Sequence, residues 1–200
     1  MFVVENLKRK YEQLTGRGKP SVKQACEAAH RTEPQQFLFP DDGSVPNNPA
    51  LPFLVYKNAV ALDGSSDPAA VFEELFAANG WGKSWRNGIY PYVHYHSSIH
   101  EVLGIARGKA RVRFGGEHGA ELEVAAGDVA VLPAGAGHQR LDASRDLLVV
   151  GAYPPDGEYD ECRGSAEEHA RARLSIPQVP VPKKDPVFGS GGPLPKLWRP

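Results

Sequence analysis

The chain has 200 residues and nearly balanced charge, with 23 Lys or Arg, 24 Asp or Glu and a formal net charge of −1 at pH 7. This balance gives neither the basic surface that nucleic-acid binding needs nor a polybasic anchor for a membrane. The length suits one domain with some additions, and an apolar share of 41% is enough for a packed soluble core. We expect no signal peptide and no spanning helix, because the first residues turn charged after a few positions. Cys26 and Cys162 are far apart in sequence and form no disulfide framework, which indicates a reducing, cytoplasmic location.

Residues 1–36 are predicted to form a helical or irregular extension. An amphipathic pattern over residues 3–14 indicates one short helix, and Ser21 is a candidate N-cap for a second helix that runs to about Arg31. Isolated helices of this length are marginal in water unless they dock on something larger. We therefore expect the extension to depend on the rest of the chain.

The central part of the chain changes from helical to strand patterning. Residues 53–56 resemble a strand, and Asp67 followed by Pro68 supplies an N-cap acceptor and a first-turn proline for a helix. From residue 88 onward, apolar side chains alternate with polar ones, as over residues 109–114 and 121–124, where arginines and glutamates are available for cross-strand pairing. Many short strands separated by glycine turns predict an all-β sandwich or barrel.

Four residues with metal-binding side chains lie within this strand-rich region. His94 and His96 are two positions apart, so both imidazoles point to one face if the segment is extended. Glu101 has the opposite parity and joins them only if residues 97–100 turn the chain and a new strand starts near Glu101. His138 then comes from a distant strand, placed by the turn at Pro133. Three imidazoles and one carboxylate suit one divalent transition metal, namely Fe, Mn, Ni, Cu or Zn, with positions left open for water or substrate. The bland alternative is that these histidines are merely buried polar groups.

The spacing of these residues resembles the two signature motifs of the cupin superfamily. The first runs from Gly88 through His94-Tyr95-His96 and Glu101 to Gly108, and the second from Gly127 through Pro133 and Gly135 to His138. The second motif often ends in an asparagine, where this chain has Asp142. Further stretches look like the YjlB-like bacterial cupins from about residue 37 to the end; they are Phe39-Pro40-Asp41-Asp42-Gly43, Trp85-Arg86-Asn87-Gly88, Val150-Gly151-Ala152-Tyr153-Pro154 and Asp185-Pro186-Val187-Phe188-Gly189.

This resemblance implies a single cupin (RmlC-like jelly-roll) β-barrel with one metal site and no established reaction. The expected organisation is an extension over residues 1–36, a barrel over residues 37–174 with its metal-site core at 88–153, and an extended arm over 175–200. The arm is rich in proline and glycine and is expected to lie over the barrel or over a neighbouring subunit.

Several neighbours of the motifs are weaker candidates for the site. His100 is a rival to Glu101 as a ligand, although adjacent strand residues face opposite ways. Tyr92 shares parity with His94 and either shapes a substrate pocket or packs as ordinary aromatic core. Arg140 shares parity with His138 and either binds a substrate carboxylate or phosphate or pairs with Glu101 or Asp142.

Two functional hypotheses follow from these patterns. The first is a metal-dependent enzyme of oxygenase, decarboxylase or isomerase type that acts on a small polar or acidic metabolite, with Tyr92 or Arg140 orienting the substrate. The second is a non-catalytic cupin that senses a metal or metabolite and uses its terminal segments to dock on a partner. For either hypothesis we expect a homodimer and no contact with nucleic acid or membrane.

Overall fold

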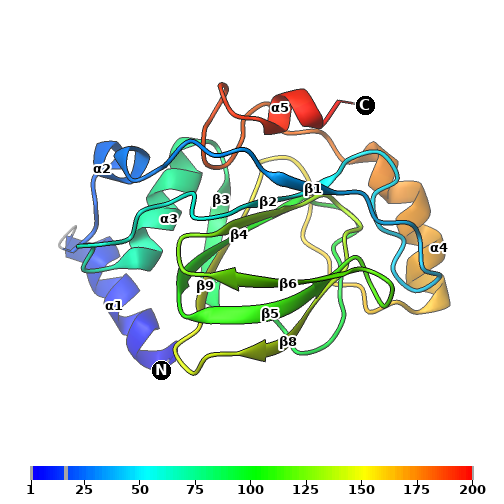
Figure 1. The fold of residues 1–200 in the computed structure, drawn as a ribbon, viewed down its shortest axis with the longest axis horizontal. Helices are drawn as coiled ribbons and strands as arrows, with labels where there is room; N and C mark the ends of the chain where they lie inside the picture. Colours follow the sequence, from blue (N-terminus) through cyan, green and yellow to red (C-terminus); the bar gives the residue numbers. More distant parts are fainter. Residues whose placement is uncertain (1, 16–17, 200) are drawn as a thin grey trace.

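Two antiparallel sheets form the centre of the molecule (Figure 1). The computed structural model describes residues 2–15 and 18–199, with only the backbone for residues 2–6 and 13. Within these residues the strands, in chain order, are β1 (Gln35–Phe37), β2 (Phe53–Tyr56), β3 (Gly82–Asn87), β4 (Glu101–Arg107), β5 (Lys109–Phe114), β6 (Ala120–Ala125), β7 (Val129–Leu132), β8 (His138–Ala143) and β9 (Leu148–Tyr153). The larger sheet has the order β1-β2-β7-β4-β9-β3 and the smaller one the order β6-β5-β8. This arrangement confirms the predicted all-β jelly-roll barrel.

Helices are few and lie outside the barrel (Figure 1). They are α1 (Phe2–Thr15), α2 (Val22–Glu27), α3 (Pro68–Ala78), α4 (Ala166–Ser175), the 3-10 turn η1 (Ile176–Gln178) and α5 (Leu194–Leu197). Asp67 caps α3 as predicted, because its carboxylate accepts hydrogen bonds from the first backbone N–H groups of the helix. The helix capped by Ser21 ends at Glu27 and not near Arg31, because the chain leaves the helix to pair Ala29 with Val60.

The larger sheet has an apolar layer on each of its faces. Its inner face meets the smaller sheet, so that Leu103 and Ile105 pack with Val112 and Phe114. Its outer face is covered by α3 and by the carboxyl-terminal arm, which contributes residues such as Trp198. Neighbouring residues along β4 therefore pack into two different cores, because successive side chains of a strand point to opposite faces of the sheet.

The arm over residues 175–200 lies against its own barrel. The Trp198 indole N–H donates to the carbonyl of Pro52, and the buried Asp185 accepts a hydrogen bond from the Tyr56 hydroxyl. The arm is not extended throughout, since η1 and α5 interrupt it. It completes the outer core instead of standing away from it.

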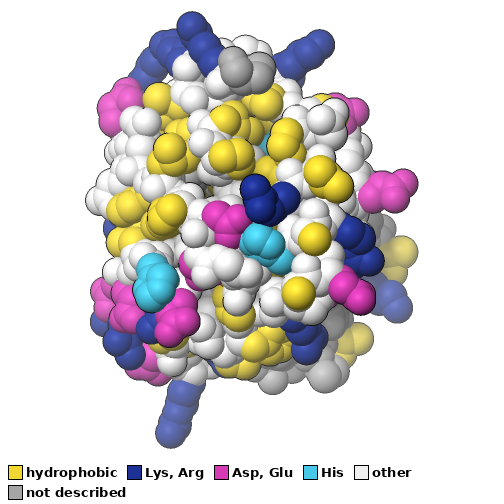
Figure 2. Space-filling view, turned by 90° about the vertical axis from the view of Figure 1, so that its right-hand side faces the viewer, with side chains coloured by type: hydrophobic (Ala, Val, Ile, Leu, Met, Phe, Trp, Pro, Cys, Tyr) yellow, Lys and Arg dark blue, Asp and Glu magenta, His cyan; other side chains and the backbone are white. Residues whose placement is uncertain are grey.

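No helix in the described ranges is long and apolar enough to cross a membrane. On the face beside α4, basic and acidic side chains are interspersed (Figure 2).

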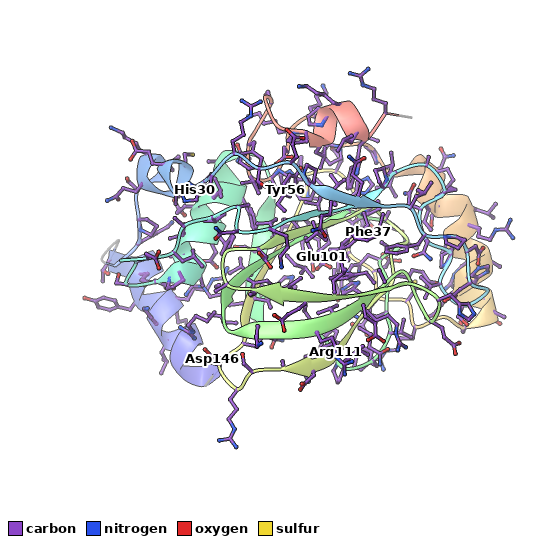
Figure 3. The ribbon with its side chains drawn as sticks, in the orientation of Figure 1. His30, Phe37, Tyr56, Glu101, Arg111 and Asp146 are labelled. Atoms are coloured by element: carbon purple, nitrogen blue, oxygen red, sulfur yellow. The ribbon has the colours of Figure 1, made fainter. Side chains whose placement is uncertain are left out.

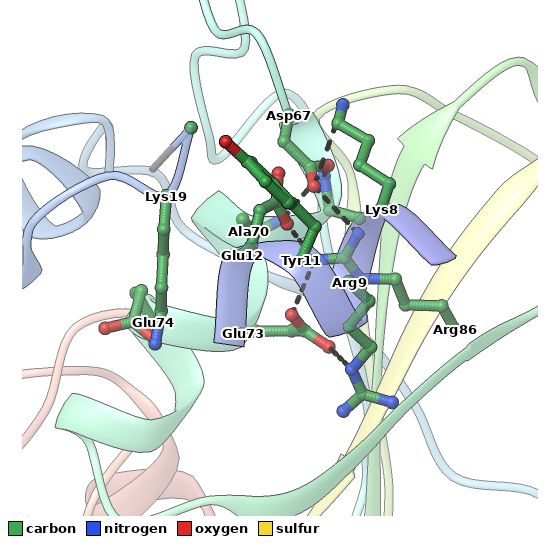
Figure 4. Close-up of polar contacts among 12 residues, drawn as sticks. Lys8, Arg9, Tyr11, Glu12, Lys19, Asp67, Ala70, Glu73, Glu74 and Arg86 are labelled. Carbon is green, nitrogen blue, oxygen red and sulfur yellow. Dashed lines mark hydrogen bonds and ion pairs between the residues drawn. The ribbon is translucent and has the colours of Figure 1, made fainter. Parts of the chain in front are cut away.

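A buried charge cluster attaches α1 to the barrel (Figure 4). The Arg86 guanidinium of β3 is only 1% exposed and lies 2.8 Å from Asp67, 2.7 Å from Glu73 and 3.4 Å from Glu12. These carboxylates belong to the N-cap of α3, to α3 itself and to α1. In contrast, the apolar Leu7 and Leu14 of α1 are exposed. Polar contacts, and not a shared apolar core, therefore hold the described part of α1 in place.

Replacing Arg86 by Ala is expected to destabilise the protein strongly. The change removes the buried counter-charge of Asp67 and Glu73, which keep only the more exposed Lys8 at 3.8 Å and Arg9 at 2.9 Å. Breaking a buried ion pair in this way costs about 3–5 kcal/mol. The matched control is Arg111→Ala, because the Arg111 side chain is 58% exposed and pairs with Glu121 at the surface, where such pairs contribute about 0–1 kcal/mol. Urea unfolding of the two variants measures the difference, and equal losses would contradict the assigned role of Arg86.

The Glu12 carboxyl is expected to make stability fall as pH rises. Burial, followed by the hydrogen bond and the charge of Asp67, raises the pKa of Glu12 from 4.5 to about 7. The folded state thus holds a proton that the unfolded state has lost, so the free energy of unfolding decreases between about pH 4.5 and about pH 7. Glu12→Gln removes this dependence, and its stability relative to the parent protein should increase from about pH 5 to about pH 8. Glu123→Gln on the exposed hairpin is the control, and an identical pH slope for both variants would refute the assignment.

Candidate metal centre

The three histidines meet because two distant segments pair side by side. His94 and His138 form an isolated antiparallel bridge, with backbone N–H to O distances of 3.2 and 2.9 Å. On the other side, Tyr95 pairs with Cys162 through bonds of 3.0 and 2.9 Å. The segment with His94 and His96 is thus extended without belonging to a named strand, and it directs both imidazoles to one face as predicted. One ring nitrogen from each of the three histidines lies within 4.8 Å of the others.

Each of these imidazoles has its Nδ1 atom against a backbone carbonyl. The three carbonyls belong to Tyr92 for His94 at 3.3 Å, to Ala136 for His138 at 3.4 Å, and to Asp160 for His96. A carbonyl only accepts, so each Nδ1 must carry the proton. In a neutral ring this leaves Nε2 as the lone-pair donor, which is the arrangement that fixes histidine ligands of metals.

Glu101 reaches the same point from the first residue of β4. Its Oε2 atom lies 3.4 Å from His96 Nε2 and 3.5 Å from His138 Nε2. The side chain is buried between the two sheets (Figure 3). Residues 97–100 turn the chain and the strand starts at Glu101, so the expected change of direction is confirmed.

The chemistry of this donor set fits a cation. Glu101 Oε2 is buried and has no hydrogen-bond partner among the described residues. A buried carboxylate oxygen left in this way is costly unless a positive charge completes its surroundings. The Nε2 atoms of His96 and His138 face this oxygen, so a cation would fit among these three atoms.

His100, the rival ligand, faces away from this point. Its Nδ1 accepts a hydrogen bond of 2.8 Å from the Ala134 N–H, and its ring packs against Trp198 at 4.8 Å. Burial lowers the pKa of His100 to about 4. His100 is therefore a neutral residue of the outer face, as strand parity predicts.

Burial and neighbouring charges shift the pKa values of the three histidines. Burial lowers the pKa of His94 and, more strongly, that of His138, and neighbouring imidazoles add to both effects. Burial opposes the charging of His96, but the Glu101 carboxylate outweighs it and raises the pKa of His96 to about 9. Two rings are thus neutral near pH 7, and the third holds a proton that a bound cation would displace.

A strap over residues 159–162 completes the site and lies outside both motifs. The Asp160 carboxylate accepts hydrogen bonds from the N–H groups of Ser97 at 2.9 Å and Ser98 at 3.1 Å, while its carbonyl accepts from His96. The Tyr159 ring lies 4.9 Å from the His96 ring. The sequence contains no local signal for this strap, because more than sixty residues separate it from the histidines that it contacts.

A cavity of about 370 Å³ opens beside the four residues. Apart from the histidines and Glu101, its wall is largely aromatic or aliphatic; the residues concerned are Trp85, Ile89, Tyr90, Leu103, Tyr153 and Tyr159. The Trp85 indole donates a hydrogen bond of 2.8 Å to the Tyr153 hydroxyl, and burial together with the nearby Glu101 carboxylate raises the pKa of Tyr153.

The two proposed substrate-orienting residues lie elsewhere. Tyr92 stacks on Tyr90 at 4.9 Å outside the cavity wall, and the Arg163 guanidinium lies 4.2 Å above its ring. Arg140 belongs to the wall of a neighbouring hollow. Its backbone N–H donates to the carbonyl of Tyr90, and its guanidinium lies beside Gly88, which lines both this hollow and the cavity. The structure therefore brings together the four predicted ligands. It places Tyr92 against His94 at 5.8 Å but off the cavity wall, and Arg140 on the wall of the neighbouring hollow.

A two-sheet jelly roll in which three histidines and one glutamate from the two motifs converge is the arrangement that the resemblance to cupins predicts. No family model matches the sequence. The chain is 42% identical over 166 residues to the Bacillus subtilis (strain 168) uncharacterised protein YjlB, an alignment that covers 83% of this chain and 97% of that protein. The chain therefore belongs to the YjlB family.

Solved structures resemble parts of the fold. A Bacillus subtilis oxalate decarboxylase variant matches at 18% identity with a TM-score of 0.35, over 57% of this chain and 28% of that one. Acireductone dioxygenase from Bacillus anthracis, solved with a cadmium ion in its active centre, matches at 19% identity with a TM-score of 0.33, over 44% and 62%. An 11S globulin from Wrightia tinctoria matches at 16% identity with a TM-score of 0.32, over 39% and 21%. In all three, the chain spans less than two thirds of the matched protein.

Gly151 of β9 is expected to be required for the position of Trp85 on the cavity wall. A Cβ atom at residue 151 would overlap the Trp85 indole, so Gly151→Ala must push the ring toward the cavity. We expect a loss of about 1–3 kcal/mol in the free energy of unfolding, as for other overpacked sites. Gly82→Ala in the neighbouring strand is the control, because nothing lies within 4 Å of a Cβ built there. Thermal unfolding that ranks the two variants equally would contradict this packing.

Proposed function

We propose that this protein is a metal-dependent enzyme in which His94, His96, Glu101 and His138 bind one divalent transition metal. The observation that carries the proposal is the unpartnered Glu101 oxygen, which lies among imidazoles whose Nδ1 atoms are already engaged. Iron, manganese, nickel, copper and zinc all suit three nitrogen donors and one oxygen donor. A bound ion of this kind would supply Lewis acidity or redox chemistry to a small molecule held beside it.

The cavity supports a catalytic site over a structural one. Structural metal sites are closed by protein ligands, whereas catalytic sites keep a position open toward substrate. Here the four candidate ligands form one end of a cavity of about 370 Å³, which is within the usual range for small-molecule pockets. The reaction classes that match such a site are those of an oxygenase, a decarboxylase or an isomerase.

The protein's own residues would position and protect the substrate. Tyr153 holds its hydroxyl between the Trp85 indole and Glu101, where it can donate to a ligand oxygen. Tyr159 covers His96 from the strap and limits access of water. The Asp160 carbonyl keeps His96 in the tautomer that presents Nε2.

A non-catalytic sensor is the second candidate, and α1 is the observation that favours it. Leu7, Tyr11 and Leu14 are all exposed on this helix and offer an apolar contact to a partner. A stoichiometric partner that is lost on deletion of residues 1–33 would favour the sensor. For either function we propose a homodimer in the cytoplasm, and elution of the purified protein at the size of a monomer would argue against the dimer.

Elemental analysis of the purified protein tests the proposed metal site. We expect about one transition-metal ion per chain in the parent protein, loss of the ion in His138→Ala, and an affinity lowered by about tenfold or more in Glu101→Gln. His118→Ala is the matched control, since His118 lies exposed on the β5–β6 turn. Metal-free parent protein, or metal retained by His138→Ala, would contradict the proposal.

A further inference from the structure

The charge of the cavity wall limits which ligands it can accept. Among the described residues, Arg86 is the only Lys or Arg on this wall. Its guanidinium is committed to Asp67 and Glu73 in the buried cluster at α1 and α3. No Lys or Arg among the described wall residues is therefore available to pair with a second negative charge on a ligand, and a buried charge without a partner is costly.

The wall instead offers flat and apolar surface. Ile89 and Leu103 are almost completely buried. Three rings of this wall contact the histidines: the Tyr90 ring lies 5.1 Å from His94, and the rings of Tyr159 and Tyr153 lie 4.9 and 6.1 Å from His96. Such ring distances are those of edge-to-face and offset contacts, which a planar ligand can extend.

The cavity volume is large enough for a ligand made of one aromatic ring and a metal-binding head group. An apolar cavity of about 150 Å³ holds benzene. The cavity here has about 370 Å³, so one ring fits together with the atoms that reach the histidines. A compact dianion would leave most of the aromatic surface uncovered.

We infer that the cavity takes a ligand with a planar, largely apolar ring, joined to a metal-binding head group that carries at most one negative charge. This inference rests on the proposed metal site and names the substrate class for it. It replaces the expectation of an acidic metabolite bound by Arg140, because that side chain lies in a different hollow.

Three hydroxamates with the same head group test the inference by calorimetry on the metal-loaded full-length protein. Benzohydroxamate carries a phenyl ring, acetohydroxamate a methyl group, and succinate monohydroxamate an added carboxylate. We expect the phenyl probe to bind about tenfold or more tighter than the methyl probe, because it buries more apolar surface. The carboxylate probe should bind more weakly than the methyl probe. Each titration is accompanied by elemental analysis of the same sample.

Variants at Tyr159 test which surface recognises the ring. Tyr159→Ala should reduce the preference for phenyl over methyl by about threefold to tenfold, while Tyr159→Phe, which keeps the ring, should retain it. Tyr159 is half-exposed, so neither change is expected to unfold the protein. Tyr11→Ala on α1 removes a similarly exposed tyrosine and is the matched control.

The outcomes separate the two proposals. If the protein holds its metal but binds the carboxylate probe most tightly, binds all three probes equally or binds none, the ligand class is wrong and the metal site stands. If the protein holds no metal under any loading condition, the proposed function fails and the ligand class fails with it.

Discussion

The buried carboxylate of Glu101 is the group around which the site is arranged. It lies between two imidazoles, and one of its oxygens has no hydrogen-bond partner among the described residues. A charge in this setting is stable only if a cation or a shared proton balances it. Glu101 is the first residue of β4, and its buried side chain brings the carboxylate to the imidazoles. A backbone carbonyl engages the Nδ1 atom of each histidine and so fixes the orientation of the ring.

Strand β3 connects this site to the charge cluster at the amino terminus. Trp85 points inward and packs over Gly151 on the cavity wall, while Arg86 points outward to carboxylates of α1 and α3. Because alternate residues of a strand face opposite sides, a displacement of α1 would be transmitted to β3 and so to the wall. None of the side chains described for α1 lines the cavity, so any effect of α1 on it would pass through β3.

The sequence predicted the features that depend on local periodicity. Strand parity placed His94 with His96, and the need for a turn before Glu101 predicted where β4 starts. Features that depend on contacts between distant segments were not predictable. Asp160 contacts His96 across 64 positions without any motif. Arg140 has the parity expected of an inward residue, but parity does not show that this residue lines a neighbouring hollow and not the cavity.

Anomalous X-ray diffraction from metal-loaded crystals tests the central claim most directly. The account predicts one anomalous peak per chain, at about 2.0–2.3 Å from the Nε2 atoms of His94, His96 and His138 and from an oxygen of Glu101. A peak bound through Nδ1 atoms, a peak remote from Glu101, or no peak in crystals grown with excess metal would contradict it.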